Sequence, residues 1–300
     1  MQSVQSKAVQ TIIKNFRDSL VLAKRFDSKI NRITFDRLSL ITKFPKNVKK
    51  EEIIYAGIEA AWITPLHFNQ NTVLLYLPGG AYCFGSFTSH KALIARIARA
   101  AHCKAIGINY AKAPEKPFPK GIEDGIDVYK QLIADGYKNI IIGGDSAGGG
   151  LALAVTLEIL NQKLPLPSSL VLIGPWTDLT MSGSTIVSNA SIDPMLPANL
   201  LGFFAEKYYA DNDPTNPLIS PLFADFKGFP PTIIHVGTNE ILLEDSIRVA
   251  QKMELANVTV ELDIWNNMMH VWHYLGGIIP EANQAINKIG NFIKKNINHH

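Results

Sequence analysis

Four apolar runs in the middle of the chain most constrain how it can fold. The runs span residues 72–77, 104–109, 139–142 and 170–173. Near-continuous apolar segments of this length are typical of strands that are buried on both faces. Because helical patterns connect the runs, we expect parallel strands with helices on both faces of the sheet. The sequence therefore predicts an α/β fold with a mostly parallel central sheet flanked by helices.

A long polar insertion and an N-terminal helix stand outside this alternation. Residues 178–228 are rich in Pro, Asp and Asn and contain one aromatic helical pattern near 200–209. An insertion of this length inside a compact domain is usually functional. The N-terminal helix is predicted from an apolar stripe at helical spacing, formed by Val9, Ile12, Ile13, Phe16 and Leu20. This stripe fits docking onto the core and a lid over a site equally well.

Composition excludes several classes of protein. With 47% hydrophobic and 18% charged residues, the 300-residue chain is a globular protein, and its length fits one large domain. A net charge of +3, scattered along the chain, gives no reason to expect a nucleic-acid partner. We expect no signal peptide, because the N-terminus lacks an apolar core followed by a cleavage site. We expect no membrane span, because no apolar stretch approaches about 18 residues.

The cysteines and histidines are too few and too dispersed for a metal cluster. Cys83 and Cys103 lie in apolar runs, and we interpret them as buried free thiols. Free thiols are typical of a reducing compartment, so we expect a cytoplasmic protein. We expect no metal and no organic cofactor.

The clearest chemical motif is a serine in a sharp turn. Residues 144–148 read Gly-Asp-Ser-Ala-Gly, which matches G-x-S-x-G between an apolar strand and a helix. This context is that of a nucleophile elbow, which exposes the hydroxyl of Ser146 above the sheet. The helix N-terminus also favours developing negative charge. The alternative, a phosphate-binding turn, lacks the G-x-G-x-x-G spacing and the Walker lysine.

A serine nucleophile needs a general base, and two histidines follow the last strand. His270 and His273 lie in the loop after the strand at 258–264, from which an imidazole can reach the top of the sheet. We favour His270 as the base and interpret His273 as structural. His235 lies inside the strand at 232–236, where a paired core histidine is expected.

The acid that orients this base should lie on the loop after the strand at 232–236. Glu240 follows that strand most closely, and Glu244 and Asp245 are the other candidates. The last two fall where a helix begins, where acidic residues ordinarily cap the helix and complement its dipole. We predict Glu240 as the acid.

An oxyanion hole requires backbone N–H groups from two places. The residue after the nucleophile, Ala147, supplies the first, and the Pro-Gly-Gly-Ala loop at 78–81 follows the strand at 72–77. A Pro-Gly sequence would form a plain tight turn in any protein. Together with the serine elbow, it favours an oxyanion loop.

These segments resemble the hormone-sensitive-lipase-like branch of the α/β-hydrolases, in particular its bacterial carboxylesterases with a G-D-S-A-G elbow. The resemblance covers about residues 50–290. Residues 75–82 look like the family's Y-x-H-G-G-G-[FY] loop, and residues 109–115 look like its D-Y-R-L-A-P-E motif. Residues 175–178, 220–222, 240–245 and 268–272 are similar to four further family motifs.

The resemblance implies an α/β-hydrolase fold with a helical cap. Residues 1–45 would form the first part of the cap, residues 46–300 the catalytic domain, and about 180–220 a second cap segment inserted into it. The hole donors would be the N–H groups of Gly80, Ala81 and Ala147, with Gly79 shaping the turn. Pro78 and Ala81 depart from the family pattern, which has histidine and glycine there.

We therefore expect a serine carboxylester hydrolase that acts on short- to medium-chain esters through an acyl-enzyme. Its partner would be a small-molecule ester, and the sequence leaves open whether the chain forms a homodimer. An amidase, a lactonase or a deacetylase of a specific metabolite remains an alternative. So does a non-catalytic ligand-binding protein on the same fold.

Overall fold

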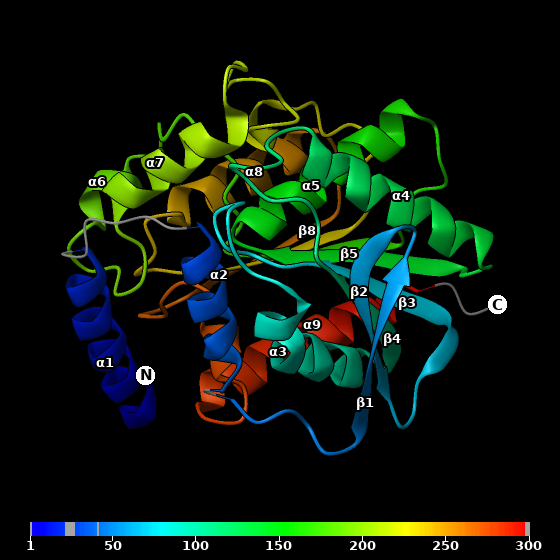
Figure 1. Ribbon diagram of the computed structural model, residues 1–300, viewed down its shortest axis with the longest axis horizontal. Coiled ribbons are helices and arrows are strands. Elements are labelled where there is room, and N and C mark those ends of the chain that lie inside the picture. Colours follow the sequence, from blue (N-terminus) through cyan, green and yellow to red (C-terminus); the bar gives the residue numbers. More distant parts are fainter. Residues whose placement is uncertain (1, 22–27, 41, 298–300) are drawn as a thin grey trace.

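An eight-stranded sheet forms the centre of the computed structural model, which describes residues 2–21, 28–40 and 42–297 (Figure 1). Its strands are β1 (Val48–Tyr55), β2 (Ile58–Pro65), β3 (Asn69–Leu77), β4 (Cys103–Ile108), β5 (Asn139–Asp145), β6 (Ser169–Ile173), β7 (Thr232–Gly237) and β8 (Val260–Trp265). Their order is β1-β2-β4-β3-β5-β6-β7-β8. Strand β2 is antiparallel to both β1 and β4, and all other pairs are parallel. The predicted α/β fold is confirmed.

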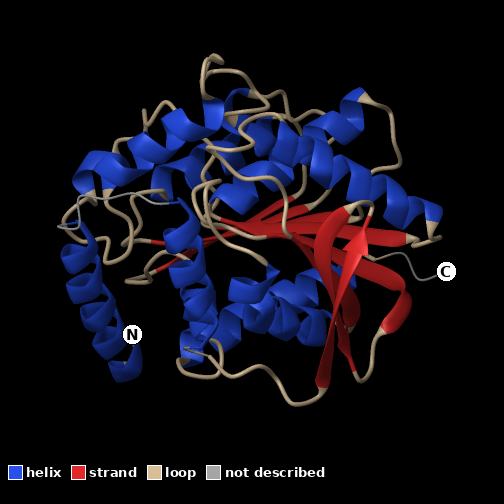
Figure 2. Cartoon of the chain, in the orientation of Figure 1, coloured by secondary structure: helices blue, strands red, loops and turns tan. Residues whose placement is uncertain are grey.

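Helices cover both faces of this sheet (Figure 2). The described helices are α1 (Val4–Val21), α2 (Ser28–Asp36), α3 (Phe87–Ala101), α4 (Lys120–Ala134), α5 (Ala147–Asn161), α6 (Thr185–Ser188), α7 (Ala198–Tyr209), α8 (Leu243–Leu255) and α9 (Pro280–Lys295). Short 3-10 turns occur at η1 (Arg37–Leu40), η2 (Pro221–Phe223) and η3 (Trp272–Leu275). Helices α3 and α9 pack together on one face, while α4, α5 and α8 cover the other.

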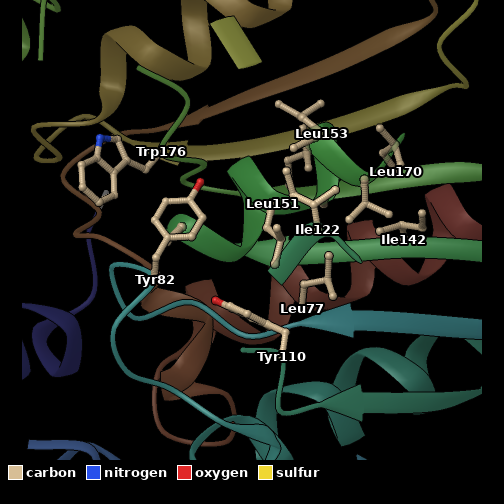
Figure 3. Packing of buried hydrophobic residues seen from close by; sticks show 14 of the residues in the cluster. Leu77, Tyr82, Tyr110, Ile122, Ile142, Leu151, Leu153, Leu170 and Trp176 are labelled. Carbon is tan, nitrogen blue, oxygen red and sulfur yellow. The ribbon is translucent and has the colours of Figure 1, made fainter. Parts of the chain in front are cut away.

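The strands are buried on both faces because their alternate side chains enter two different cores. On β3, Leu75 and Leu77 face the core shared with α4, α5 and α8, whereas Leu74 and Tyr76 face the core under α3 and α9. Figure 3 shows the first of these cores, with Leu77 on its strand. This alternation follows from the pleat, in which successive side chains point to opposite faces. It explains the near-continuous apolar runs of the sequence.

The N-terminal helix is present, but its predicted stripe is only partly buried. Val9 and Ile13 pack against the cluster around Met268 and Trp272, whereas the side chain of Ile12 is 67% exposed. The side chains of Phe16 and Leu20 lie outside the described residues.

Two other expectations concern membranes and thiols. Cys83 and Cys103 are buried free thiols, as expected. Within the described ranges, no helix is both long and apolar enough to cross a membrane.

Candidate active site

Ser146 sits in a strained turn between β5 and α5. Its backbone has φ 54° and ψ −126°, a conformation that residues other than glycine rarely adopt. The Ser146 N–H donates to the carbonyl of Ile173 at 2.9 Å, and the Ser146 carbonyl accepts the N–H of Trp176 at 2.9 Å. Both partners belong to β6 and the loop after it, so the neighbouring strand holds the turn in place.

The two glycines of the elbow are required by close backbone contacts. A Cβ on Gly144 would lie 2.2 Å from the carbonyl oxygen of Gly148. A Cβ on Gly148 would lie 2.0 Å from the carbonyl oxygen of Leu77, the last residue of β3. Any larger residue would force the strand, turn and helix apart. The same contact brings the end of β3, and the loop after it, next to the elbow.

Glu240 and His270 form a buried hydrogen-bonded pair. The Oε2 atom of Glu240 lies 2.6 Å from Nδ1 of His270, and Oε1 accepts the N–H of Gly237 at 2.6 Å. Both side chains are almost completely buried. Since Nδ1 donates to the carboxylate, Nε2 is the basic nitrogen of the neutral ring. Within the described part of the chain, Nε2 has no hydrogen-bond partner.

Gly174 makes room for this pair, and the sequence analysis missed it. The residue has φ 50°, and a Cβ there would lie 2.6 Å from Oε2 of Glu240 and 3.0 Å from Nδ1 of His270. Any side chain would therefore displace the carboxylate or the imidazole. The only sequence signal was its place directly before the family-like segment at 175–178.

The surroundings of His270 favour its charged form. Burial acts to lower the pKa of His270, but the charge and hydrogen bond of Glu240 outweigh it, and Asp193 and Asp145 add to the rise. The pKa of His270 is therefore above its ordinary value of 6.5.

This shift predicts the pH dependence of catalysis. As the predicted general base, His270 would have to be neutral to accept a proton, so kcat/KM should fall as the pH drops through the raised pKa of His270. The midpoint of this acid limb should lie above 6.5. A pH profile on a neutral p-nitrophenyl ester measures it, and a rate already at its plateau near about pH 5 would argue against a histidine base.

The other acid candidates serve different parts of the structure. Asp245 accepts the N–H groups of Thr177 at 2.8 Å and Asp178 at 2.9 Å. Glu244 accepts the hydroxyl of Ser184 at 2.6 Å. Both lie in the first turn of α8 as expected, but neither carboxylate caps the helix: the N-cap residue Leu242 makes no side-chain cap hydrogen bond, and the hydroxyl of Thr185 accepts the N–H of Glu244 at 3.1 Å. They tie the start of the insertion to α8.

The histidines that were interpreted as structural are paired in the core. Nδ1 of His235 lies 3.0 Å from Nε2 of His273, and Nε2 of His235 lies 3.3 Å from Asp263. Both rings are fully buried. Burial lowers the pKa of each, so both stay neutral.

The insertion clamps the loop that carries Glu240, which the sequence did not indicate. The side-chain amide of Asn189 donates to the carbonyls of Thr238 at 3.1 Å and Glu240 at 2.8 Å. The buried carboxylate of Asp193 accepts the N–H of Ile241 at 2.9 Å. These contacts hold the backbone on both sides of the acid. No local pattern predicts them, since the partners are about 50 residues apart in sequence.

The predicted oxyanion loop has an unusual backbone. Gly80, Ala81 and Tyr82 have φ values of 129°, 51° and 58°, so three successive residues lie at positive φ. The N–H groups of Gly80 and Ala81 donate to no other described residue, which leaves both available to a ligand. Within this loop, a Cβ on Gly79 would lie 2.3 Å from Oδ2 of Asp145.

Asp145 anchors this loop from beneath. Its Oδ1 accepts the N–H of Gly79 at 3.2 Å and the hydroxyl of Tyr76 at 2.8 Å, and its Oδ2 lies 3.3 Å from Nε2 of His90. Burial alone would raise the pKa of Asp145, but His90 and these hydrogen bonds lower it, so the carboxylate is charged. The elbow residue next to Ser146 is thus fixed to the loop that faces it. The sequence indicates Asp145 only as part of the G-x-S-x-G motif and gives no signal for His90 in this role.

Known proteins resemble this chain over most of its length. A family model described as the alpha/beta hydrolase fold matches residues 74–274. An acetyl-hydrolase of Streptomyces hygroscopicus is 36% identical over 237 residues, covering 78% of this chain and 79% of that protein. An esterase of Acinetobacter venetianus is 35% identical over 289 residues, covering 92% of this chain and 94% of that protein.

Solved structures extend the likeness to the whole fold. An esterase from the bacterial hormone-sensitive lipase family superposes with a TM-score of 0.94 at 34% identity, over 99% of this chain and all of that chain. A second structure, of an esterase soaked with p-nitrophenyl butyrate, has a TM-score of 0.93 at 34% identity and covers 98% of this chain and 99% of that one. The family predicted from the sequence motifs is confirmed: the chain belongs to the α/β-hydrolases, among the bacterial esterases of the hormone-sensitive lipase family.

Proposed function

We propose that this carboxylesterase cleaves its substrate through an acyl-enzyme formed on Ser146. The Oγ–H proton passes to Nε2 of His270 as Oγ attacks the ester carbonyl and the carbonyl oxygen becomes an oxyanion. The alcohol then leaves with the proton from His270. Water attacks the acyl-serine by the same route and releases the acid. The observation that carries this proposal is the buried pair of Glu240 and His270 at 2.6 Å, with Nε2 unoccupied by any described residue.

Glu240 and the oxyanion loop have supporting roles in this proposal. The carboxylate fixes the tautomer of His270 and stabilises the imidazolium that forms during the reaction. The N–H groups of Gly80, Ala81 and Ala147 bind the oxyanion, and Gly79 shapes the turn. Such donors act at positions where charge develops only in the transition state.

A serine-directed probe tests the nucleophile assignment. A fluorophosphonate should label the protein at one site, and peptide mapping should place the label on Ser146. Labelling of another serine, or none, would contradict the proposal. The esterase and acetyl-hydrolase relatives favour ester hydrolysis over the amidase, lactonase and ligand-binding alternatives.

We also propose a cap over the site, built from residues 1–45 and about 180–220, on a catalytic domain of residues 46–300. Aromatic residues of α7 support it, because they pack on the segment that follows the oxyanion donors. Tyr208 stacks on Tyr82 with ring centres 3.7 Å apart, and Phe204 meets Phe84 edge-on at 5.0 Å. Met269 is another candidate for lining the acyl pocket, and it is buried in the same cluster as Trp272.

An aromatic cap of this kind over the site predicts a limited acyl chain length. An acyl chain that is too long for a packed pocket costs about 1–3 kcal/mol, which lowers kcat/KM roughly 5- to 150-fold for each extension that does not fit. We expect kcat/KM on p-nitrophenyl esters to peak at about four to eight acyl carbons. A chain-length series measures this directly. Best activity on long-chain triglyceride emulsions would overturn the prediction.

Two expectations stay predictions. The buried free thiols support a cytoplasmic location, and labelling the protein in intact cells tests it. A homodimer is tested by the molar mass in solution.

A further inference from the structure

One face of helix α2 packs along the segment that follows the oxyanion loop. Arg32, Phe35 and Asp36 are spaced three and four residues apart and so share a helix face. The ring of Phe35 stacks on Phe84 at 6.0 Å. Asp36 accepts the hydroxyl of Ser86 at 2.5 Å, at the start of α3.

Arg32 makes the most direct of these contacts. Its Nε donates to the carbonyl of Cys83 at 2.8 Å, and its Nη2 donates to the carbonyl of Ala113 at 2.8 Å. The guanidinium also meets Glu115 through Nη2 at 2.6 Å and Nη1 at 3.3 Å. A planar fork with several fixed donors can join three acceptors in this way, which a lysine cannot. Arg32 therefore links two loops that are 30 residues apart.

The second of these loops holds the oxyanion loop from its other side. The N–H of Ala113 donates to the carbonyl of Tyr82 at 3.0 Å, and the hydroxyl of Tyr110 donates to the carbonyl of Pro78 at 2.7 Å. Tyr82 and Tyr110 lie near each other in this part of the molecule (Figure 3). Both ends of the loop, at Pro78 and at Cys83, thus depend on contacts from outside it.

These contacts are needed because the loop is strained. Ala81 and Tyr82 are successive residues other than glycine, and their φ values are 51° and 58°. That region is unfavourable for both, so the backbone would relax if its anchors were lost. Relaxation would move the N–H groups of Gly80 and Ala81 away from the oxyanion.

We propose that Arg32, from the N-terminal segment, is a positioning residue for the oxyanion hole. It touches neither substrate nor reacting atoms and acts through the carbonyls of Cys83 and Ala113. This inference rests on the proposed function, because it needs Gly80 and Ala81 to be hole donors.

The test compares Arg32→Met, which keeps the bulk of the side chain, with Arg32→Lys. Rates are expressed per active site titrated with the fluorophosphonate, so that unfolded protein does not count. For Arg32→Met we expect kcat on p-nitrophenyl butyrate to fall about 10- to 100-fold with KM nearly unchanged, as for a small misplacement of a reacting group. The kcat of Arg32→Lys should lie between that of Arg32→Met and that of the unmodified protein.

A second readout is specific to the oxyanion. A trifluoromethyl ketone binds as a tetrahedral adduct whose oxygen occupies the hole, so its inhibition constant should rise by the same factor as kcat/KM falls. Guanidinium ion added to the assay can donate to the same carbonyls of Cys83 and Ala113, so it should restore part of the activity of Arg32→Met. Arg37, an exposed arginine directly after α2, provides the matched control, and Arg37→Met should behave as the unmodified protein. In Glu115→Gln, Arg32 keeps its contacts with the carbonyls of Cys83 and Ala113, so kcat should fall by about threefold at most.

Three outcomes decide the matter. A loss in kcat that is shared by the ketone confirms the positioning role. Unchanged kcat per titrated site in Arg32→Met, or a loss confined to thermal stability, would overturn it while the unmodified enzyme still turns over esters. If the unmodified protein neither turns over the ester nor takes up the probe at Ser146, the proposed function and this inference fall together.

Discussion

The Ser146→Ala variant should lose roughly 10⁴- to 10⁶-fold in kcat/KM on p-nitrophenyl butyrate, because removal of the nucleophile leaves only binding and the oxyanion hole. The backbone of the elbow is held by Ile173 and Trp176 and by the close approach of Gly144 to Gly148. The variant should therefore fold and bind substrate as before. Steady-state kinetics measure the loss, and a thermal melt checks the fold.

A surface serine provides the matched control. Ser191 is exposed on the insertion, and Ser191→Ala should keep the full rate. Equal turnover by the Ser146→Ala and unmodified proteins would show that another group attacks the ester.

Glu240→Gln should lower kcat by roughly 10²- to 10⁴-fold. The amide has the shape of the carboxylate but no charge to stabilise the imidazolium of His270. It can also turn its NH₂ group toward Nδ1 and favour the wrong tautomer of the ring. Because the glutamate is fully buried, water cannot replace the lost interaction. Because the glutamine no longer raises the pKa of His270, the acid limb of the pH profile should move to lower pH.

The neighbouring acids separate this effect from a general loss of charge. Glu244→Gln should change kcat little, since Glu244 binds Ser184 and not His270. Asp245→Asn should lower stability more than the rate per folded molecule, because the buried carboxylate accepts two backbone N–H groups. If Asp245→Asn were the crippling variant and Glu240→Gln were harmless, the acid would be wrongly assigned.

The parts of this structure that could be predicted are those that depend on local sequence. The strands appear as apolar runs because both of their faces are buried, and the elbow appears as a motif because two glycines and a serine must fit one turn. The order of Ser146, Glu240 and His270 along the chain then follows from the order of parallel strands. Helix α7 was likewise visible as an aromatic pattern, with bounds within two residues of the prediction.

The parts that could not be predicted depend on contacts between distant segments. Asn189 and Asp193 hold the loop of Glu240, and Arg32 reaches Cys83 across 51 residues, with no periodicity or motif to indicate either. The exposed Ile12 shows that an apolar stripe at helical spacing need not be buried along its whole length. Helical spacing shows which residues share a face but not what covers that face.

The most direct test of the mechanism is a rapid-quench measurement with p-nitrophenyl butyrate followed by intact-mass analysis. An acyl-enzyme on Ser146 whose hydrolysis limits turnover predicts a burst of p-nitrophenol equal to the concentration of titrated sites, and a mass increase of one butyryl group that maps to the peptide containing Ser146. Neither the burst nor the added mass should appear in Ser146→Ala. A linear release of p-nitrophenol with no burst, together with full turnover by Ser146→Ala, would contradict covalent catalysis at this serine.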